Sequence, residues 1–205
     1  MMKIGRILPK GFYARDPAMV ARRLLGNVLY RVSEKKVMAG VIVETEAYYG
    51  RSDPASRAYK SSGEIAAMLY GDVGRALIYG VHGKWLFNIV AHEPHGCGGV
   101  LIRALEPVIG MEEMKRLRGT SDVFQLANGP GKLTEAVAID KSLHKKPVYL
   151  KSSEITVRKG REEVNIASSF RIGVARDISI PLRFYAANSR FVSSRKNLTS
   201  TRFKA

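Results

Sequence analysis

The sequence predicts an α+β fold: one mixed domain in which a curved, largely antiparallel sheet is flanked by helices. Short apolar runs typical of strands follow one another between glycines and polar turns, and helix signals occur among them at irregular intervals. The chain contains neither G-x-G-x-x-G nor G-x-x-x-x-G-K-[ST], the glycine-rich motifs of nucleotide-binding folds. No internal repeat or linker divides it, so we expect a single domain over residues 1–205.

The first predicted elements are a capped helix and a hairpin. Asp16 is a favoured N-cap, Pro17 suits the first helical position, and Gly26 follows the last apolar pair. The apolar runs 28–32 and 37–47 lie on either side of a polar turn, which predicts two antiparallel strands.

Helices and strands then continue without a fixed alternation. Ser61 and Glu64 have the spacing of a capping box, which predicts a short helix after them. The pair Glu106-Pro107 and Pro130 each open a further predicted helix. The remaining apolar runs predict strands at residues 76–79, 85–90, 100–105, 155–157, 170–174 and 182–186.

Composition limits the class of protein. The 205 residues include 34 Lys+Arg and 18 Asp+Glu, a formal net charge of +16, and 45% are hydrophobic. A folded chain with this charge is expected to bind a polyanion, and nucleic acid is the default partner. The single cysteine, Cys97, cannot form an internal disulfide, which is typical of a reducing compartment. No apolar run has the length of a membrane span or a signal-peptide core, so we expect a cytoplasmic protein without membrane contact.

The positive charge is concentrated toward the C-terminus. No acidic residue follows Asp177, whereas basic residues continue to the end of the chain: Arg183, Arg190, Arg195, Lys196, Arg202 and Lys204. A basic tail over about residues 187–205 is either a solvated extension or a surface that contacts nucleic acid, and charge patterning favours neither.

Two segments carry polar groups that an apolar strand does not need. The two-residue period of a strand places Glu44, Glu46 and Tyr48 on one face of the run 43–48. Two adjacent carboxylates repel, so they require a cation, a metal or a raised pKa, unless both pair with surface Lys or Arg. Arg103 lies inside another apolar run and needs an acidic partner, which Glu44 or Glu46 could provide.

Other candidate sites are weaker. His92, His95 and Cys97 are possible zinc ligands, but they lie in a Gly/Pro loop without a fourth ligand, and we expect no metal or other cofactor. A glycine-bearing segment combines aromatic and polar side chains that are either core residues of a hairpin or part of a site: Tyr79, His82, Trp85 and Asn88.

Six ordered blocks resemble the alkyladenine (3-methyladenine, methylpurine) DNA glycosylase family. They are FYARD at 12–16 with VARRLLG at 20–26, VETEAY at 43–48, LIRALEP at 101–107, NGPGKL at 128–133, RIGV at 171–174 and RFY at 183–185. The resemblance extends over nearly the whole chain. It implies a single mixed α/β domain around a curved, largely antiparallel sheet, with a protruding β-hairpin that is inserted into DNA.

The resemblance also implies a reaction. A monofunctional DNA glycosylase of base excision repair flips a damaged purine out of the duplex and hydrolyses its N-glycosidic bond, which leaves an abasic site. Its substrates are 3-methyladenine, 7-methylguanine, hypoxanthine and ethenoadenine. Glu46 matches the residue that activates water, Arg103 the arginine that holds this water and the carboxylate, and Ile172 a backbone contact. We expect a monomer that acts on double-stranded DNA, associated with the nucleoid if the cell is prokaryotic.

Further residues match the family's base pocket. Tyr48 corresponds to one wall. In the preferred alignment Tyr79 is the opposite wall, His82 the side chain wedged into the duplex, and Asn88 the pocket asparagine. In the alternative alignment the wall is Ala76 and the wedge is Tyr79. A pair of electron-rich rings favours a cationic base.

Other positions concern contacts with DNA or depart from the family pattern. The matched blocks imply DNA contacts at Lys132 and Arg183. Arg57 stands where the family usually has a histidine against the base. A permanent cation there either turns toward a phosphate or shifts the substrate range toward neutral lesions. His82 replaces the family's usual tyrosine and is smaller and ionisable.

Two other functions are compatible with parts of the sequence. One is a noncatalytic nucleic-acid-binding domain of related fold, since fold alone does not fix function. The other is a metal-dependent nuclease that uses Glu44, Glu46 and Asp53. The arginine expected among these carboxylates disfavours the nuclease, and a carboxylate that faces DNA phosphates has no purpose in a simple binder.

Overall fold

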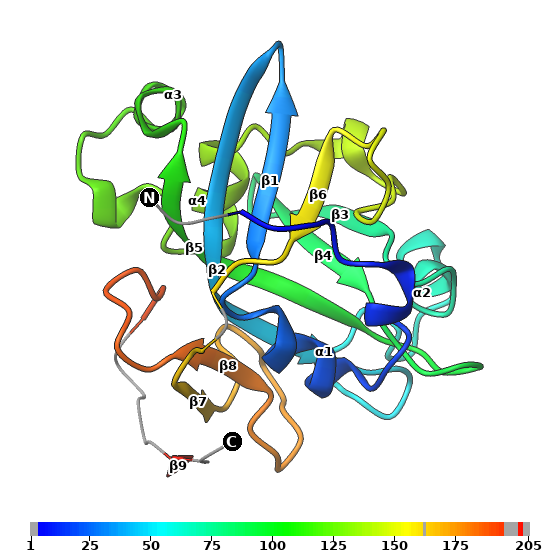
Figure 1. Cartoon of the computed structure of the whole chain (residues 1–205). Helices are drawn as coiled ribbons and strands as arrows, with labels where there is room; N and C mark the ends of the chain where they lie inside the picture. Colours follow the sequence, from blue (N-terminus) through cyan, green and yellow to red (C-terminus); the bar gives the residue numbers. More distant parts are fainter. Residues whose placement is uncertain (1–3, 162, 195–200, 203–205) are drawn as a thin grey trace.

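A strongly curled antiparallel sheet forms the centre of the molecule (Figure 1). The computed structural model describes residues 4–161, 163–194 and 201–202. Within these, every pairing between neighbouring strands is antiparallel, in the order β3-β4-β5-β2-β8-β7-β9, and β1 joins β2 to β6. The strands are β1 Val28–Ser33, β2 Lys36–Tyr48, β3 Ala76–Val81, β4 Lys84–Val90, β5 Gly99–Ile109, β6 Ile155–Arg158, β7 Ile166–Ser169, β8 Arg183–Ala186 and β9 Thr201–Arg202.

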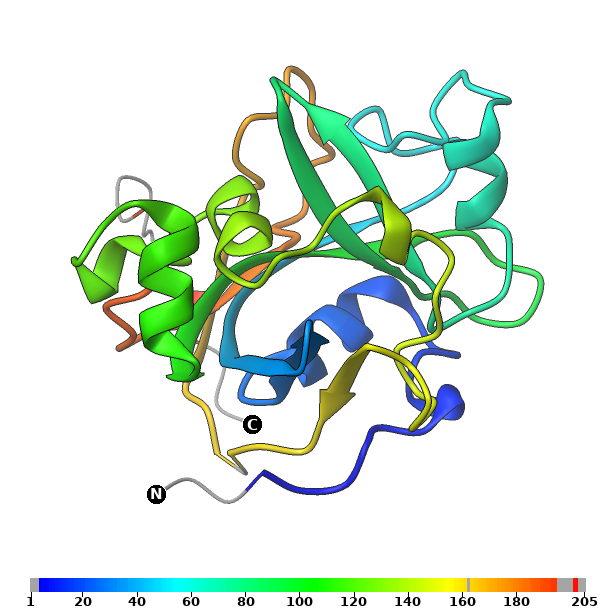
Figure 2. The ribbon, with the colours of Figure 1, turned by 90° about the horizontal axis from the view of Figure 1, so that it is seen from above.

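Helices cover parts of this sheet without forming a repeated unit with it. The α-helices are α1 Pro17–Leu24, α2 Glu64–Leu69, α3 Met111–Arg118 and α4 Pro130–Ala136, and short 3-10 turns lie at Lys10–Phe12, Val123–Gln125 and Lys141–Leu143. α1 packs against β2 and β5, α4 packs against β4 and β5, and α3 lies beside α4 (Figure 2). The predicted α+β class with a curved antiparallel sheet is therefore confirmed.

The start of α1 follows the sequence signals closely. The Asp16 carboxylate accepts hydrogen bonds from the backbone N–H groups of Ala18 and Met19 at 2.9 and 3.1 Å, and Pro17 occupies the first turn. Gly26 follows the helix with a φ of +82°, a left-handed conformation that glycine adopts without steric cost. Val20, one of the fully buried residues of α1, packs into the main core.

An irregularity in β2 sets the direction of the side chains that matter for the site. The register between β2 and β5 shifts between Ile42 and Glu44 and again between Glu44 and Thr45. Beyond this bulge Thr45 faces α1, where its hydroxyl donates to the Ala21 carbonyl at 2.9 Å. Glu46 and Tyr48, in the same phase as Glu44, lie on the opposite face.

The helix predicted to open at Glu106-Pro107 is wrong at its start. β5 continues through these residues to Ile109, and α3 begins only at Met111. Pro107 is tolerated in the strand because it pairs with Gly40 beside a register shift, and because β4 pairs with β5 only over 99–101. Among the described residues, the other edge of β5 is thus without a strand partner at Pro107, a position where a missing N–H costs no ladder hydrogen bond.

Two further local predictions are wrong. Gly63, not Ser61, is the N-cap of α2, and the Ser61 hydroxyl instead accepts from the Gly63 N–H at 3.5 Å. Residues 170–174 form a loop, and the strand in this region is β7, which ends at Ser169. The backbone N–H of Ile172 donates to a carboxylate rather than to a neighbouring strand.

The expected basic tail lies partly outside the described residues, so the structure addresses only a part of it. Among the residues that are described, no helix is both long enough and apolar enough to span a bilayer.

The cap of α1 gives a test of the fold. Asp16→Ala removes both cap bonds and the 2.9 Å hydrogen bond that the Tyr49 hydroxyl donates to the same carboxylate. We expect the free energy of unfolding in urea to fall by about 1–2 kcal/mol. The control is Glu112→Ala, whose side chain is 87% exposed in the first turn of α3, and which should change it by less than about 0.5 kcal/mol. Equal losses in the two variants would contradict the assigned role of the cap.

Candidate active site

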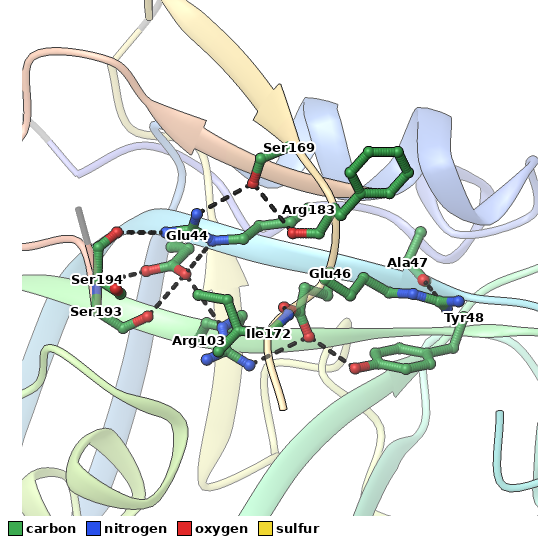
Figure 3. Close-up of polar contacts among 12 residues, drawn as sticks. Glu44, Glu46, Ala47, Tyr48, Arg103, Ser169, Ile172, Arg183, Ser193 and Ser194 are labelled. Carbon is green, nitrogen blue, oxygen red and sulfur yellow. Dashed lines mark hydrogen bonds and ion pairs between the residues drawn. The ribbon is translucent and has the colours of Figure 1, made fainter. Parts of the chain in front are cut away.

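The end of β2 brings together the polar residues that the sequence places on one face. Glu44, Glu46 and Tyr48 project from β2 toward Arg103 on β5, as Figure 3 shows. Glu44 and Glu46 are fully buried, and Arg103 is 7% exposed. A charged group that far from water is stable only with partners, so the contacts of each carboxylate define what it can do.

Glu46 is held by three donors from three parts of the chain. Oε1 accepts from the backbone N–H of Ile172 at 2.8 Å. Oε2 accepts from the Tyr48 hydroxyl at 2.7 Å and from Nη1 of Arg103 at 3.1 Å. A carboxylate has about four acceptor sites. The contacts within the described chain therefore leave one site, on Oε1, for a further donor.

The Tyr48 hydroxyl is fixed as a donor. Burial and the adjacent Glu46 carboxylate raise the pKa of Tyr48 well above its ordinary value, which keeps the phenol protonated. The Tyr48 hydroxyl is therefore a donor to Glu46 at neutral pH.

Glu44 anchors the other side of Arg103. Its Oε1 accepts from Nε of Arg103 at 3.1 Å and from Nε of Arg183 at 2.7 Å. The Ser193 backbone N–H and hydroxyl also donate to Glu44, at 2.6 and 2.8 Å. The result is a buried chain of alternating charge that runs from Arg183 through Glu44 and Arg103 to Glu46.

This chain of charges revises the expectation for Arg183. The side chain is fully buried, and its guanidinium also donates to the Ser169 hydroxyl at 3.1 Å and to the Ser194 carbonyl at 2.8 Å. A guanidinium enclosed in this way cannot reach a DNA phosphate. We therefore assign Arg183 to the interior network and not to the DNA surface.

A second ion cluster positions the loop that follows β7. The guanidinium of Arg171 pairs with Asp53 at 2.7 Å and with Asp177 at 2.5 Å, and also donates to the Ala47 carbonyl at 2.9 Å. Burial acts to raise the pKa of Asp53, but the hydrogen bonds from Arg171 and the backbone bring it below its ordinary value. The cluster fixes Arg171, the residue next to Ile172, and thereby positions the Ile172 N–H that donates to Glu46.

A cavity of about 860 Å³ lies beside Glu46. Its lining includes the rings of Tyr48 and Tyr79, and also Arg103 and Ile172, which both donate to the Glu46 carboxylate. Glu46 is not itself part of the lining, but three groups that hold it are. A smaller adjoining hollow shares Tyr48 and Tyr79 with the cavity and extends to Asn88.

The β3–β4 hairpin forms one rim of this cavity. Its two-residue turn has positive φ at His82 (+48°) and Gly83 (+72°), as a tight hairpin turn requires. Figure 2 shows this turn at the top of the view, beside the orange-brown loop that precedes β8. His82 is exposed at the tip and lines the cavity, whereas Ala76 is fully buried in the main core. This placement fits the alignment that puts Tyr79 at the wall and His82 at the tip, and does not fit the alternative with Ala76 at the wall.

The other sequence-predicted residues are distributed as follows. Arg57 lines the cavity with its guanidinium carbon 5.0 Å from the Tyr79 ring centroid. The Asn88 amide donates to the Leu77 carbonyl at 3.2 Å. Lys132, in the first turn of α4, donates to Gln125 and Asn128 at 2.7 and 2.9 Å.

The loop with His92, His95 and Cys97 lies away from these groups and lines a separate hollow. Both ring nitrogens of His92 contact main-chain carbonyl oxygens, of Glu93 at 2.7 Å and of Gly71 at 2.8 Å. Within the described chain, no three His, Cys, Asp or Glu side chains are grouped so that they could hold a metal ion.

Three positioning residues were not identified from the sequence: Arg171, Asp177 and Ser193. Arg171 stands in a matched block without an assigned role, and Asp177 is the last acidic residue of the chain. Those two facts were the only available signals for them. For Ser193 the sequence offers none, because a serine near a basic C-terminus is unremarkable.

Comparison with known proteins places this geometry in a family. The family model of methylpurine-DNA glycosylase matches residues 11–190. A protein of Aeropyrum pernix is 44% identical over 93% of this chain and 94% of its own length. Proteins of Methanoculleus marisnigri and Koribacter versatilis are 39% and 40% identical, over 92% and 93% of this chain and 99% and 95% of their own. All three are provisionally named 3-methyladenine DNA glycosylase.

The matched region includes β2, β5, the loop after β7 and β8, and so contains the three donors to Glu46 that the described structure shows: Tyr48, Arg103 and Ile172. On this evidence the chain belongs to the methylpurine-DNA glycosylase family, whose enzymes are hydrolases that act on N-glycosyl bonds of damaged DNA.

Proposed function

We propose that this protein is a monofunctional glycosylase that acts as a monomer on double-stranded DNA, flips a damaged purine into the cavity between Tyr48 and Tyr79, and hydrolyses its N-glycosidic bond. One observation carries the proposal. A buried carboxylate, Glu46, is held by Ile172, Tyr48 and Arg103 directly beside a cavity with two aromatic walls. The proposed substrates are alkylated or deaminated purines.

In the proposed reaction, a water molecule donates to the open acceptor site on Oε1 of Glu46. Glu46 takes a proton from this water while the oxygen of the water forms a bond to C1′ of the sugar. The C1′–N bond breaks, and its electron pair leaves with the base. The positive charge that builds on the sugar is offset by the carboxylate, whose orientation is fixed by its three donors.

The cavity walls support recognition of a flat ring. A purine that enters between Tyr48 and Tyr79 can stack on both side chains. Asn88, at the end of the adjoining hollow, has a side-chain oxygen and an amide group that can test the edge of the base. In the proposed complex His82, which lines the cavity at the hairpin tip, fills the space in the base stack that the flipped nucleotide leaves.

The alternatives are less consistent with these contacts. In a noncatalytic binder, a buried carboxylate beside the ligand cavity would repel phosphates without purpose. In a metal-dependent nuclease, Asp53 would have to join Glu44 and Glu46, but it pairs with Arg171 instead. Arg103 also occupies the space between the two glutamates that a cation would need.

Glu46→Gln tests the catalytic role. It preserves the shape of the side chain but removes the charge and the basicity, so we expect release of free base from a hypoxanthine-containing duplex to fall by at least about 100-fold. Binding to the same duplex should persist within a few-fold. Glu93→Gln, at an exposed carboxylate in the 92–97 loop, is the matched control and should retain full release. Retained activity in Glu46→Gln would refute the proposed role.

The choice of water as nucleophile is tested on the wild-type protein. Because the proposed mechanism uses neither a metal nor a covalent enzyme intermediate, base release should persist in excess EDTA. Borohydride should trap no protein–DNA adduct, and the strand should break only after alkaline treatment of the abasic product. Loss of release in EDTA, or a trapped adduct, would contradict hydrolysis by a Glu46-activated water.

The hairpin tip is tested with His82→Gly. Glycine accepts the positive φ of this position, so the variant removes the side chain without straining the turn. We expect base release to fall by about tenfold for a stably paired lesion and by less for a mismatched one, because the side chain offsets the cost of unstacking. His95→Gly is a matched control: it is also an exposed histidine with positive φ, and it lies outside the cavity. A similar decrease in both variants would argue against insertion by His82.

A further inference from the structure

Each tyrosine wall of the cavity already has an arginine against its ring. The guanidinium carbon of Arg171 is 4.6 Å from the Tyr48 ring centroid, and that of Arg57 is 5.0 Å from the Tyr79 centroid. The Arg171 side chain is fully buried and is not part of the cavity lining, so it lies behind Tyr48. Arg57 is exposed and does line the cavity, together with both tyrosines.

These contacts change what the aromatic pair can attract. A tyrosine ring binds a cation through the negative potential of its face. Arg171 already uses this potential at Tyr48, where it is locked by Asp53 and Asp177. At Tyr79 the guanidinium of Arg57 competes directly with any cation in the cavity for the face of the ring. A base that carries a positive charge would therefore meet a like charge at the wall that should attract it.

The movement of electrons in the reaction also favours neutral bases over cationic ones in this cavity. When the C1′–N bond breaks, its electron pair moves to the base. A cationic base such as 7-methylguanine leaves as a neutral molecule and needs no further help. A neutral base such as hypoxanthine leaves with a negative charge unless it gains a proton, so a guanidinium within the cavity stabilises its departure by donating hydrogen bonds.

We propose that Arg57 is a specificity-determining residue that makes this cavity select neutral purine lesions over cationic ones. The inference rests on the proposed function, because it concerns the base that the Glu46 site releases. The Arg57 side chain then has two effects on the base: it repels a bound cation, and it donates hydrogen bonds to a departing neutral base.

The test compares hypoxanthine with 7-methylguanine in otherwise identical duplexes. Base release is measured with enzyme in excess and is divided by the spontaneous rate for each lesion, which gives an enhancement for each base. The wild type should show the larger enhancement for hypoxanthine. Arg57→Gln should lower the ratio of the hypoxanthine to the 7-methylguanine enhancement by about tenfold. Arg57→Lys retains the charge and should keep the order of preference.

The control is Arg51→Gln, which removes the same charge from an exposed position six residues earlier in the chain and outside this cavity. It should leave the ratio unchanged. A uniform decrease for both lesions in Arg57→Gln would show that Arg57 contacts a phosphate, and would overturn the proposal. A wild type with the larger enhancement for 7-methylguanine would overturn it as well, while leaving the glycosylase activity established. A wild type that releases neither base would refute the proposed function itself.

Discussion

The position of Arg103 between Glu44 and Glu46 is the constraint on which the rest of the site depends. Removing either partner from such a buried pair leaves an uncompensated charge, whereas an apolar replacement of the whole group is often neutral or stabilising. Stability alone therefore does not explain why the network is present. We propose that the network serves to hold the Glu46 carboxylate in one orientation beside the cavity, which an apolar core could not do.

Distant segments of the chain converge on this network. β2 contributes both glutamates, β5 contributes Arg103, and β8 contributes Arg183 from the opposite side of β2. The loop after β7 supplies the Ile172 N–H, and the neighbouring Arg171 is held in place by ion pairs with two aspartates. A curled antiparallel sheet suits this purpose, because it places β5 and β8 on the two edges of one strand. The fold therefore contributes mainly by fixing the angles at which donors reach one carboxylate.

The sequence predicted those parts of this arrangement that depend on local chemistry. Asp16 and Pro17 predict the start of α1. The alternation of Glu44, Glu46 and Tyr48 predicts a polar face, because side chains in a strand alternate between its two faces. Arg103 predicts a buried acidic partner, because a guanidinium cannot remain unpaired among apolar residues. The family resemblance, not the spacing, supplied the roles of these side chains.

The features that the sequence could not predict depend on which distant parts of the chain come together on folding. Arg183 follows the last acidic residue of the chain and looks like part of a basic surface, yet it is fully buried against Glu44. Pro107 looks like a helix start, yet it lies in a strand at a point without a neighbour on one side in the described structure. Residues 170–174 look like a strand, yet their backbone serves a carboxylate.

Charge balance explains how one site can use so many cations. The two glutamates, Glu44 and Glu46, balance the two arginines, Arg103 and Arg183, so the four buried side chains together carry no net charge. In the second cluster Asp53 and Asp177 both pair with Arg171, so the formal charges of that cluster sum to −1. In the proposed reaction, the positive charge that develops on the sugar faces a carboxylate whose hydrogen-bond donors are already in place, which is the condition for preorganised stabilisation. Arg57, which is exposed and lines the cavity, is the cation to which we attribute discrimination between departing bases.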